Sequence, residues 1–187
     1  MTLAPHVAQL RSGTKMGDIK YLDRMIHDGL WYAFNQYHMG QTAENVASQY
    51  GISHDAQDEF ALTSQNKAEA AQKARHFIKE ISPFTVKSHK CYIIIEMDEY
   101  TRHGATIEGM QKMHPAFWGD GGPVTAANAS GINNGATAVL PMTVKRAEER
   151  SIKPLARIAS YATVGLDPSI MGVGPIFASR KALAKTS

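Results

Sequence analysis

The sequence contains a single cysteine, Cys91, among its 187 residues. One thiol cannot form an internal disulfide, so the chain is no disulfide-stabilised domain and fits a reducing compartment. No apolar run approaches the roughly 20 residues that a membrane-spanning helix needs. The opening residues, MTLAPHVAQL, lack the basic segment and sustained apolar core of a secretory signal. We therefore expect a cytoplasmic protein, unless an organelle-targeting segment precedes Met1.

The sequence also has little excess charge. It contains 20 basic and 17 acidic side chains, and the formal net charge is +3. The lysines and arginines are interspersed with acids instead of clustering, which argues against nucleic-acid binding. The small excess would suit an anionic ligand, but it would equally suit an ordinary surface. A hydrophobic content of 43% with 20% charged residues is typical of a globular chain that buries a core.

Metal and nucleotide motifs are missing as well. The eight histidines show no H-x-x-x-H spacing, and His89 alone lies near the one cysteine, so we expect no zinc site. The run GDGGP lacks the Lys-Ser/Thr of a phosphate-binding loop, and its Pro123 removes an amide donor. The run MGVGP lacks the spacing of a dinucleotide fingerprint. These glycines therefore predict tight turns.

Apolar periodicity and capping residues predict a mixed α/β chain. The predicted helices run from a cap at Asp18 to Leu30, over 42–50 up to Gly51, over 53–77 with Ser53 as cap, over 144–152, and from 178 to 184. Ile81–Val86 and Tyr92–Ile95 should form a strand pair, and 155–165 a buried strand. Residues 98–120 are predicted as a polar loop.

Two interpretations of this pattern remain open. The chain could be a small α+β domain with irregular loops, or a segment of a larger protein. It begins in a loop without a strand before its first helix, and it stops within a helix start. Because so few strands give the helices little sheet to cover, we favour the segment.

Three places could carry chemistry. Cys91 precedes an apolar strand and follows His89 and Lys90, so it is either a thiol activated by these neighbours or, as we favour, an inert one. His38, in the turn YHMG, is either structural or functional. The run NASGINNGA is rich in small residues, with Asn128 and Ser130 as its polar groups. It is either a tightly packed turn before a buried strand or a place where backbone meets a slender ligand.

Several runs together resemble the thiolase family, and within it the acetyl-CoA acetyltransferase (acetoacetyl-CoA thiolase) branch. They occur in the family's order and extend from about Ala4 to Leu183. The runs are KMGD, YHMGQTAENVA, SQNKAEAAQ, DEYTRHGAT, VTAANASGINNGA and ATVGLDPSIMGVGP. Each is weakly specific alone, and their common order makes the resemblance strong.

The resemblance implies a partial α/β, thiolase-like fold. Thiolases have two similar α/β halves and a loop domain inserted in the first. The implied division is 1–37 in the N-terminal half, 38–122 as the inserted coenzyme A-binding domain, 123–150 as the end of that half, and 151–187 as the start of the C-terminal half. The parent protein would be a homotetramer, with the KMGD region near its contacts.

The function implied is reversible Claisen condensation of acetyl-CoA to acetoacetyl-CoA. A cysteine takes the acyl group from one thioester, a second cysteine removes a proton from acetyl-CoA, and hydrogen-bond donors hold the oxyanions. Coenzyme A thioesters are substrates, and no covalently bound cofactor is implied. Both cysteines should lie outside Met1–Ser187, so we expect the chain alone to be inactive. An alternative is a non-catalytic acyl-CoA-binding or oligomer-forming chain.

The resemblance also assigns ligand-binding roles to side chains of this chain, and the YHMG form favours a short acyl group. They are His38 and Met39 in the acyl pocket, Met171 by the reacting end, Leu30 and Phe117 as walls of the coenzyme tunnel, Ser130 bonded to the pantetheine arm between Ala126 and Ala129, and Arg102 at the nucleotide end. The chain departs from the family at Gly109, where a serine often touches the nucleotide. Ala127 replaces a commoner glycine near the tunnel.

Overall fold

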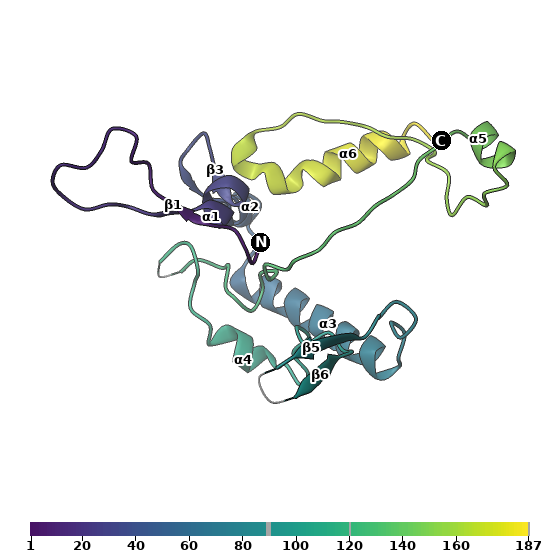
Figure 1. Ribbon diagram of the computed structural model, residues 1–187, viewed down its shortest axis with the longest axis horizontal. Coiled ribbons are helices and arrows are strands. Elements are labelled where there is room, and N and C mark those ends of the chain that lie inside the picture. The colour runs from purple at the N-terminus through teal and green to yellow at the C-terminus, as the bar shows by residue number, and fades with distance from the viewer. Residues whose placement is uncertain (89–90, 120, 187) are drawn as a thin grey trace. The chain divides into compact units, whose positions relative to one another are not determined.

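The computed structural model describes residues 1–88, 91–119 and 121–186 (Figure 1). It divides into two compact units. Unit 1 combines Met1–Val46 with Gly131–Ser187, and unit 2 is Ala47–Ser130. The boundary near residue 46 falls within one helix, α2 (Gly40–Tyr50).

Unit 1 begins with a short antiparallel pair, β1 (His6–Val7) and β2 (Leu22–Asp23), which leads into helix α1 (Arg24–Gly29). The cap of α1 is Asp23, whose Oδ1 accepts a hydrogen bond from the Met25 amide at 2.9 Å. The predicted start after Asp18 is therefore wrong. Pairing of β2 with β1 holds Leu22 and Asp23 in extended backbone, so the helix cannot begin before Arg24.

A second short hairpin follows, formed by β3 (Trp31–Tyr32) and β4 (Tyr37–His38), with Trp31 opposite His38. Helix α2 comes next and ends before Gly51, whose φ of +64° lies in the left-handed region that ends helices without strain at glycine. The prediction of a helix closed by Gly51 is confirmed.

The remainder of unit 1 contains α5 (Val144–Glu149), the 3₁₀ helix η1 (Pro168–Val173) and α6 (Gly174–Leu183). The hydroxyl of Thr143 caps α5 by accepting from the Arg146 amide at 3.2 Å. Residues 131–143 form neither helix nor strand and run as a plain ribbon in Figure 1. The predicted helices near 144–152 and 178–184 are confirmed, with the second beginning earlier than expected.

The buried strand predicted for 155–165 is wrong. Leu155, Ile158 and Tyr161 are exposed, and no strand in the described part of the chain pairs with this segment. A strand needs a neighbour to satisfy its backbone groups. The segment is tied to α6 by side chains instead, because Ser160 Oγ donates to the Ala182 carbonyl at 2.7 Å and Lys185 Nζ to the Tyr161 carbonyl at 2.8 Å.

Unit 2 is built on the long helix α3 (His54–Lys73), capped by Ser53, whose Oγ accepts from the Ala56 amide at 3.2 Å. The hairpin of β5 (Phe84–Lys87) and β6 (Tyr92–Ile95) pairs Phe84 with Ile95. The Ser53 cap and the strand pair are confirmed, but α3 ends at Lys73 and not at Phe77, since Arg75 has a left-handed φ of +58°, and the first strand begins at Phe84 and not at Ile81. Residues 89–90 of the predicted connection lie outside the described residues.

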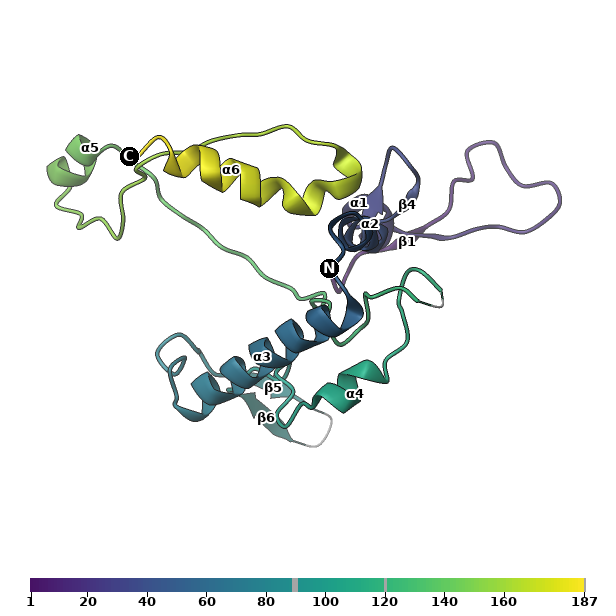
Figure 2. The same ribbon diagram turned by 180° about the vertical axis from the view of Figure 1, so that it is seen from behind.

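The loop predicted for 98–120 contains a short helix, α4 (Ile107–Gln111), which lies alongside α3 in both views of the molecule (Figures 1 and 2). Thr106 caps it by accepting from the Gly109 amide at 3.2 Å. Glycine within the helix lowers its intrinsic propensity. Burial of Met110, which is 6% exposed, overrides that weakness.

Few large apolar side chains are buried in either unit. The buried apolar residues include Met110 and Val124 in unit 2 and Val173 in unit 1, whereas Asp58 and Thr125 are polar and fully buried. None of the helices in the described ranges has the length and apolar character that crossing a bilayer requires. The same ranges contain no group of three or more His, Cys, Asp or Glu side chains arranged to hold a metal.

Candidate functional site

Backbone hydrogen bonds bring Leu30 and Met39 together in unit 1. Leu30 ends helix α1, with its amide donating to the Ile26 carbonyl at 2.8 Å. Its own carbonyl accepts from the Met39 amide at 2.7 Å, which closes the β3–β4 hairpin. Both side chains are half-buried. Two of the residues predicted to line the site therefore lie side by side.

The position of the ring proton on His38 follows from one hydrogen bond. The Gly40 amide donates to Nδ1 of His38 at 3.0 Å. Because an amide N–H can only donate, Nδ1 is the acceptor and the neutral ring carries its proton on Nε2. The half-buried ring thus has a defined tautomer, with an N–H donor on the nitrogen distant from the backbone.

Asn45, on α2, ties the hairpin to the segment that carries Met171. Its Nδ2 donates to the Tyr37 hydroxyl at 3.1 Å and to the Ser169 carbonyl at 3.1 Å. Gly172 lies next to Val46, since a Cβ at Gly172 would be 3.9 Å from Val46 Cγ2. Unit 1 therefore gathers the segments that bear His38, Met39 and Met171, and the Met171 side chain stays 46% exposed.

An acidic cap shapes the Met171 segment. The carboxylate of Asp167 accepts from the Ser169 amide at 2.8 Å, and hydrogen bonds from Ser169 lower the pKa of Asp167. Ile170 has non-helical backbone, with φ −126° and ψ 31°, so η1 kinks just before Met171. Burial raises the pKa of the Tyr32 hydroxyl, with smaller contributions from Tyr37 and Asp167.

In unit 2, helix α3 holds the loop that contains Arg102. Gln65 Oε1 accepts from the Arg102 amide at 3.0 Å, and Glu69 Oε2 accepts from the Gly104 amide at 2.8 Å. The Lys73 side chain, and then the Gly104 amide, lower the pKa of Glu69. The backbone at 102–104 is thus fixed on the helix surface, while the Arg102 side chain is exposed.

The turn at 123–130 is fixed to the same helix by Asn128. Its Oδ1 accepts from the Thr125 amide at 2.8 Å, and its Nδ2 donates to the Pro123 carbonyl at 2.8 Å and to Asp58 Oδ1 at 2.9 Å. Ala126, Ala129 and Ser130 are exposed on this turn. Three of the residues predicted to meet pantetheine therefore share one turn.

Phe117 lies on the strand-like approach to that turn. Its neighbour Ala116 donates its amide to the Val124 carbonyl at 2.8 Å, and Pro115 forms an isolated antiparallel bridge with Thr125. The Phe117 ring is half-buried. In unit 2, contacts of the adjoining backbone thus position Phe117, Ser130 and the two alanines. Arg102 is positioned by a different part of α3, around Gln65 and Glu69.

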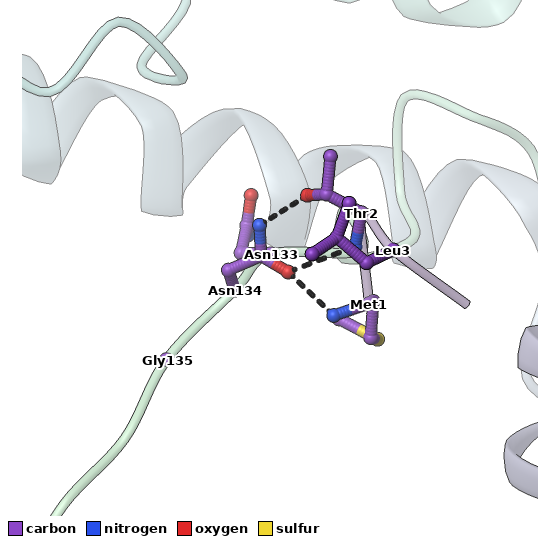
Figure 3. Close-up of a pocket in the computed structure, with 6 residues that line it drawn as sticks. All are labelled: Met1, Thr2, Leu3, Asn133, Asn134 and Gly135. Carbon is purple, nitrogen blue, oxygen red and sulfur yellow. Dashed lines mark hydrogen bonds between the residues drawn. The ribbon is translucent and has the colours of Figure 1, made fainter.

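Two further features include none of the predicted site residues. Cys91 is a free, exposed thiol at the start of β6, where its carbonyl accepts from the Ser88 amide at 2.8 Å. A hollow of about 540 Å³ lies beside residues 1–3 and 133–135 (Figure 3). The Asn134 carboxamide spans it, accepting from the Met1 amino group at 2.8 Å and donating to the Thr2 hydroxyl.

Asn45 and Asp58 were not predicted as site residues, although both hold predicted ones in place. Asparagine and aspartate are poor helix formers, since their side chains compete for backbone groups. Their presence within α2 and α3 is a weak local signal that each has another partner. That signal could have marked Asn45 and Asp58 as unusual helix residues, but it could not have identified their partners, which lie 124 and 70 residues away.

Comparison with known proteins identifies the family. The model of the thiolase N-terminal domain matches residues 1–145. The acetyl-CoA acetyltransferase of Paracoccus denitrificans is 62% identical over 185 residues, which are 99% of this chain and 47% of that protein. The cytosolic acetyl-CoA acetyltransferase of Rattus norvegicus is 53% identical over 186 residues, again 99% of this chain and 47% of the relative.

Solved structures agree. The Bacillus anthracis acetyl-CoA acetyltransferase superposes with a TM-score of 0.86 at 37% identity, covering 97% of this chain and 46% of that one. Human mitochondrial 3-ketoacyl-CoA thiolase gives a TM-score of 0.86 at 41% identity, covering 98% and 46%. The chain belongs to the thiolase family and has part of the thiolase fold, as predicted. It spans about half the length of the curated relatives it matches.

Proposed function

We propose that this chain forms the acyl-CoA-holding part of an acetyl-CoA acetyltransferase. The reaction is transfer of an acetyl group between thioesters, with Claisen condensation of acetyl-CoA to acetoacetyl-CoA and its reversal. Coenzyme A thioesters are the substrates, and no bound cofactor takes part. The observation that carries the proposal is the Asn45 connection, which holds the His38–Met39 turn and the Met171 segment together.

The residues of unit 1 suit the reacting end of a short acyl thioester. Met39, Leu30 and Met171 offer flexible apolar surface for an acetyl or acetoacetyl group. The imidazole of His38 lies in the same turn as Met39 and is suited to hydrogen-bond a thioester oxygen that gains negative charge. These roles follow the resemblance.

The residues of unit 2 suit the coenzyme. Ser130 donates a hydrogen bond to the pantetheine arm, and Ala126 and Ala129 leave room for the arm because they lack bulk. Phe117 forms an apolar wall. The exposed guanidinium of Arg102 stacks on adenine or binds phosphate, for which a planar, permanent cation is suited.

The same proposal covers organisation and location. Residues 1–37, 123–150 and 151–187 would belong to the two α/β halves, and 38–122 to the inserted loop domain. The complete enzyme would be a cytoplasmic homotetramer. Relatives described as cytosolic in rat and mouse support the location.

The nucleophilic and basic cysteines belong to parts of the enzyme outside Met1–Ser187. The chain alone should therefore bind coenzyme A weakly, since ordering a partial site costs free energy. Incubation with acetoacetyl-CoA and free coenzyme A should yield no acetyl-CoA. Sustained turnover that alkylation of Cys91 abolishes would contradict this assignment.

Binding provides the second test. Titration calorimetry with coenzyme A should give a measurable affinity for the wild-type chain and one about tenfold weaker for Ser130→Ala, which loses one hydrogen bond. Ser64→Ala is the matched control, because Ser64 is an exposed serine on α3. Equal affinities for Ser130→Ala and Ser64→Ala would remove Ser130 from the site, and silence at millimolar ligand would remove the binding role altogether.

A second candidate function is assembly without catalysis. Unit 1 exposes large apolar side chains at Val139, Leu140, Leu155 and Ile158. Contiguous exposed apolar surface often marks protein contacts. Sedimentation of the chain should show a defined oligomer if assembly is its role. A monomer that binds coenzyme A would support the first proposal and exclude the second.

A further inference from the structure

Asp58 is a fully buried acid on the second turn of α3, with 0% of its surface exposed. Removing a carboxylate from water costs several kcal/mol, and only close partners offset that cost. Oδ1 accepts from Asn128 Nδ2 at 2.9 Å. Oδ2 lies 3.1 Å from Nε2 of His54, but neither atom has a hydrogen-bond partner of good geometry among the described residues. The Asn128 amide is thus the directional partner of Asp58.

Asn128 uses its side-chain oxygen and both of its N–H groups in one orientation. Its oxygen accepts from Thr125, and its two N–H groups serve Pro123 and Asp58. The Asp58 oxygen accepts this bond, so it holds the amide nitrogen toward α3. A rotated amide would set its oxygen against the carboxylate and against the Pro123 carbonyl. The contact therefore selects one conformation of the turn.

The turn closes around Thr125, another fully buried polar residue. Its Oγ1 accepts from the Ala127 amide at 3.2 Å, and its carbonyl accepts from the Ala129 amide at 3.1 Å. With Thr125 and Asn128 directed inward, Ala126, Ala129 and Ser130 are left exposed. One side of the turn is thus polar, buried and fully bonded, and its other side is small and accessible.

From this arrangement we infer that Asp58 is a positioning residue that acts through Asn128 on the turn at 123–130. It keeps Ser130 and the two alanines in the shape that meets the pantetheine arm. The inference rests on the proposed function for the ligand, while the contact itself does not. Replacing a buried ionic contact by apolar groups is often neutral for stability, so geometric specificity is a stronger reason for a buried acid than stability.

The internal bonds of the turn allow the role of Asp58 to be separated from that of Asn128. Asp58→Ala removes the anchor on α3 but leaves the bonds of Asn128 to Thr125 and Pro123. Asp58→Asn keeps an acceptor of the same shape at Oδ1 and should restore most of the effect. Glu59→Gln is the matched control, since Glu59 is the next residue on α3 and is exposed.

The experiment measures amide hydrogen exchange and coenzyme A affinity on the full chain for wild type and these three variants. Asp58→Ala should speed exchange at the Thr125 and Ala129 amides about tenfold, and weaken coenzyme A binding about tenfold, as loss of one buried hydrogen bond predicts. Exchange within α3 should stay within about threefold of wild type. Asp58→Asn should recover most of both losses, and Glu59→Gln should match wild type.

Unchanged exchange at Thr125 and Ala129 in Asp58→Ala would overturn the inference. Faster exchange along all of α3 would overturn it too, because it would make Asp58 a general stabiliser of the helix. If Asp58→Ala does not fold, Asp58→Asn still decides, since a conservative variant that binds and exchanges unlike wild type contradicts the expected rescue. A wild-type chain without affinity for coenzyme A would refute the proposed function, and exchange would still determine whether Asp58 holds the turn.

Discussion

The side-chain amide of Asn45 donates a hydrogen bond of 3.1 Å to the backbone carbonyl of Ser169, 124 residues further along the chain. A second bond of 3.1 Å from the same nitrogen reaches the Tyr37 hydroxyl. One side chain on α2 therefore joins the turn next to His38 and the segment just before Met171. Long-range contacts of this kind bring separate runs of sequence into one site.

Asn45→Ala should release the Met171 segment. Two hydrogen bonds are lost, each contributing about 1 kcal/mol, and the better helix propensity of alanine offsets part of the loss, so we expect unit 1 to lose roughly 1 kcal/mol of stability. Hydrogen exchange at the Ile170 amide, which donates to the Asp167 carbonyl at 3.1 Å, should increase. Gln49→Ala, an exposed amide on the same helix, should leave that exchange unchanged.

Tyr37→Phe separates the two bonds of Asn45. It removes only the hydroxyl, so the bond to the Ser169 carbonyl remains and exchange at Ile170 should rise less than in Asn45→Ala. An equal rise in both variants would show that the Tyr37 hydroxyl, and not the Ser169 carbonyl, is the contact that matters for the Met171 segment.

Glu69 should make the Arg102 loop sensitive to acid. Its pKa is lowered from 4.5 by Lys73 and by the Gly104 amide. Because the folded pKa is below the unfolded one, the stabilisation is complete above the unfolded value and disappears as pH falls through the folded one. The Gly104 amide resonance, followed by NMR from neutral pH downward, should shift with a midpoint below pH 4.5.

The variant Glu69→Gln keeps an acceptor for the Gly104 amide but cannot titrate. Its Gly104 resonance should therefore lose the acid transition. Glu59→Gln, an exposed acid on the same helix, should retain it. A transition that survives in Glu69→Gln would assign the acid response to another group.

Gly51 should tolerate no side chain without cost. Its φ is +64°, and nothing lies within 4 Å of a Cβ built there. The penalty is thus purely conformational, and Gly51→Ala should destabilise the α2–α3 junction by about 1 kcal/mol. Gly29→Ala is the matched control, since it also has open space but no left-handed backbone. Exchange at the Ile52 amide, bonded to the Ala47 carbonyl at 2.9 Å, should rise in the first variant alone.

Local signals explain which elements were predictable. Ser53 and Gly51 mark their helix ends through their own side chain or its absence, so the end of α2 and the start of α3 could be read from adjacent residues. Residues 155–165 have the composition of a strand, but a strand depends on a partner that composition cannot supply. Asp23 caps α1 in place of the predicted Asp18 for a similar reason. The residues before Arg24 are extended because β2 pairs with β1, and the residues around Asp18 do not reveal that pairing.

The candidate site divides in the same way. Its exposed candidates, such as Ser130 and Arg102, stay predictions that rest on surrounding runs that resemble a family. Asp58 and Asn45, which hold those runs in place, act through contacts 70 and 124 residues apart. Their environment, full burial in one case and two bonded partners in the other, exists only in the folded chain. Sequence can therefore propose the contact residues of a site, but it cannot identify the side chains that support them.

Gly109 offers a test in which affinity should increase. It lies within α4 at a position where the resemblance places a serine near the nucleotide, and its backbone is not left-handed. A Cβ there would lie 3.3 Å from Thr106 Oγ1, so the Thr106 side chain must shift by a few tenths of an ångström. Leaving glycine gains about 0.5 kcal/mol of helix propensity, which offsets a slightly weakened cap.

Gly109→Ser should therefore fold normally and bind coenzyme A about threefold to tenfold more tightly, as one added hydrogen bond predicts. Gly109→Ala supplies the Cβ without the hydroxyl, and calorimetry should find its affinity equal to that of wild type. Equal tightening in both variants would attribute the gain to a stiffer α4, and no tightening in either would place the nucleotide away from residue 109. Only a gain confined to serine supports direct contact, because the two variants share the same backbone effect and differ by a single hydroxyl group.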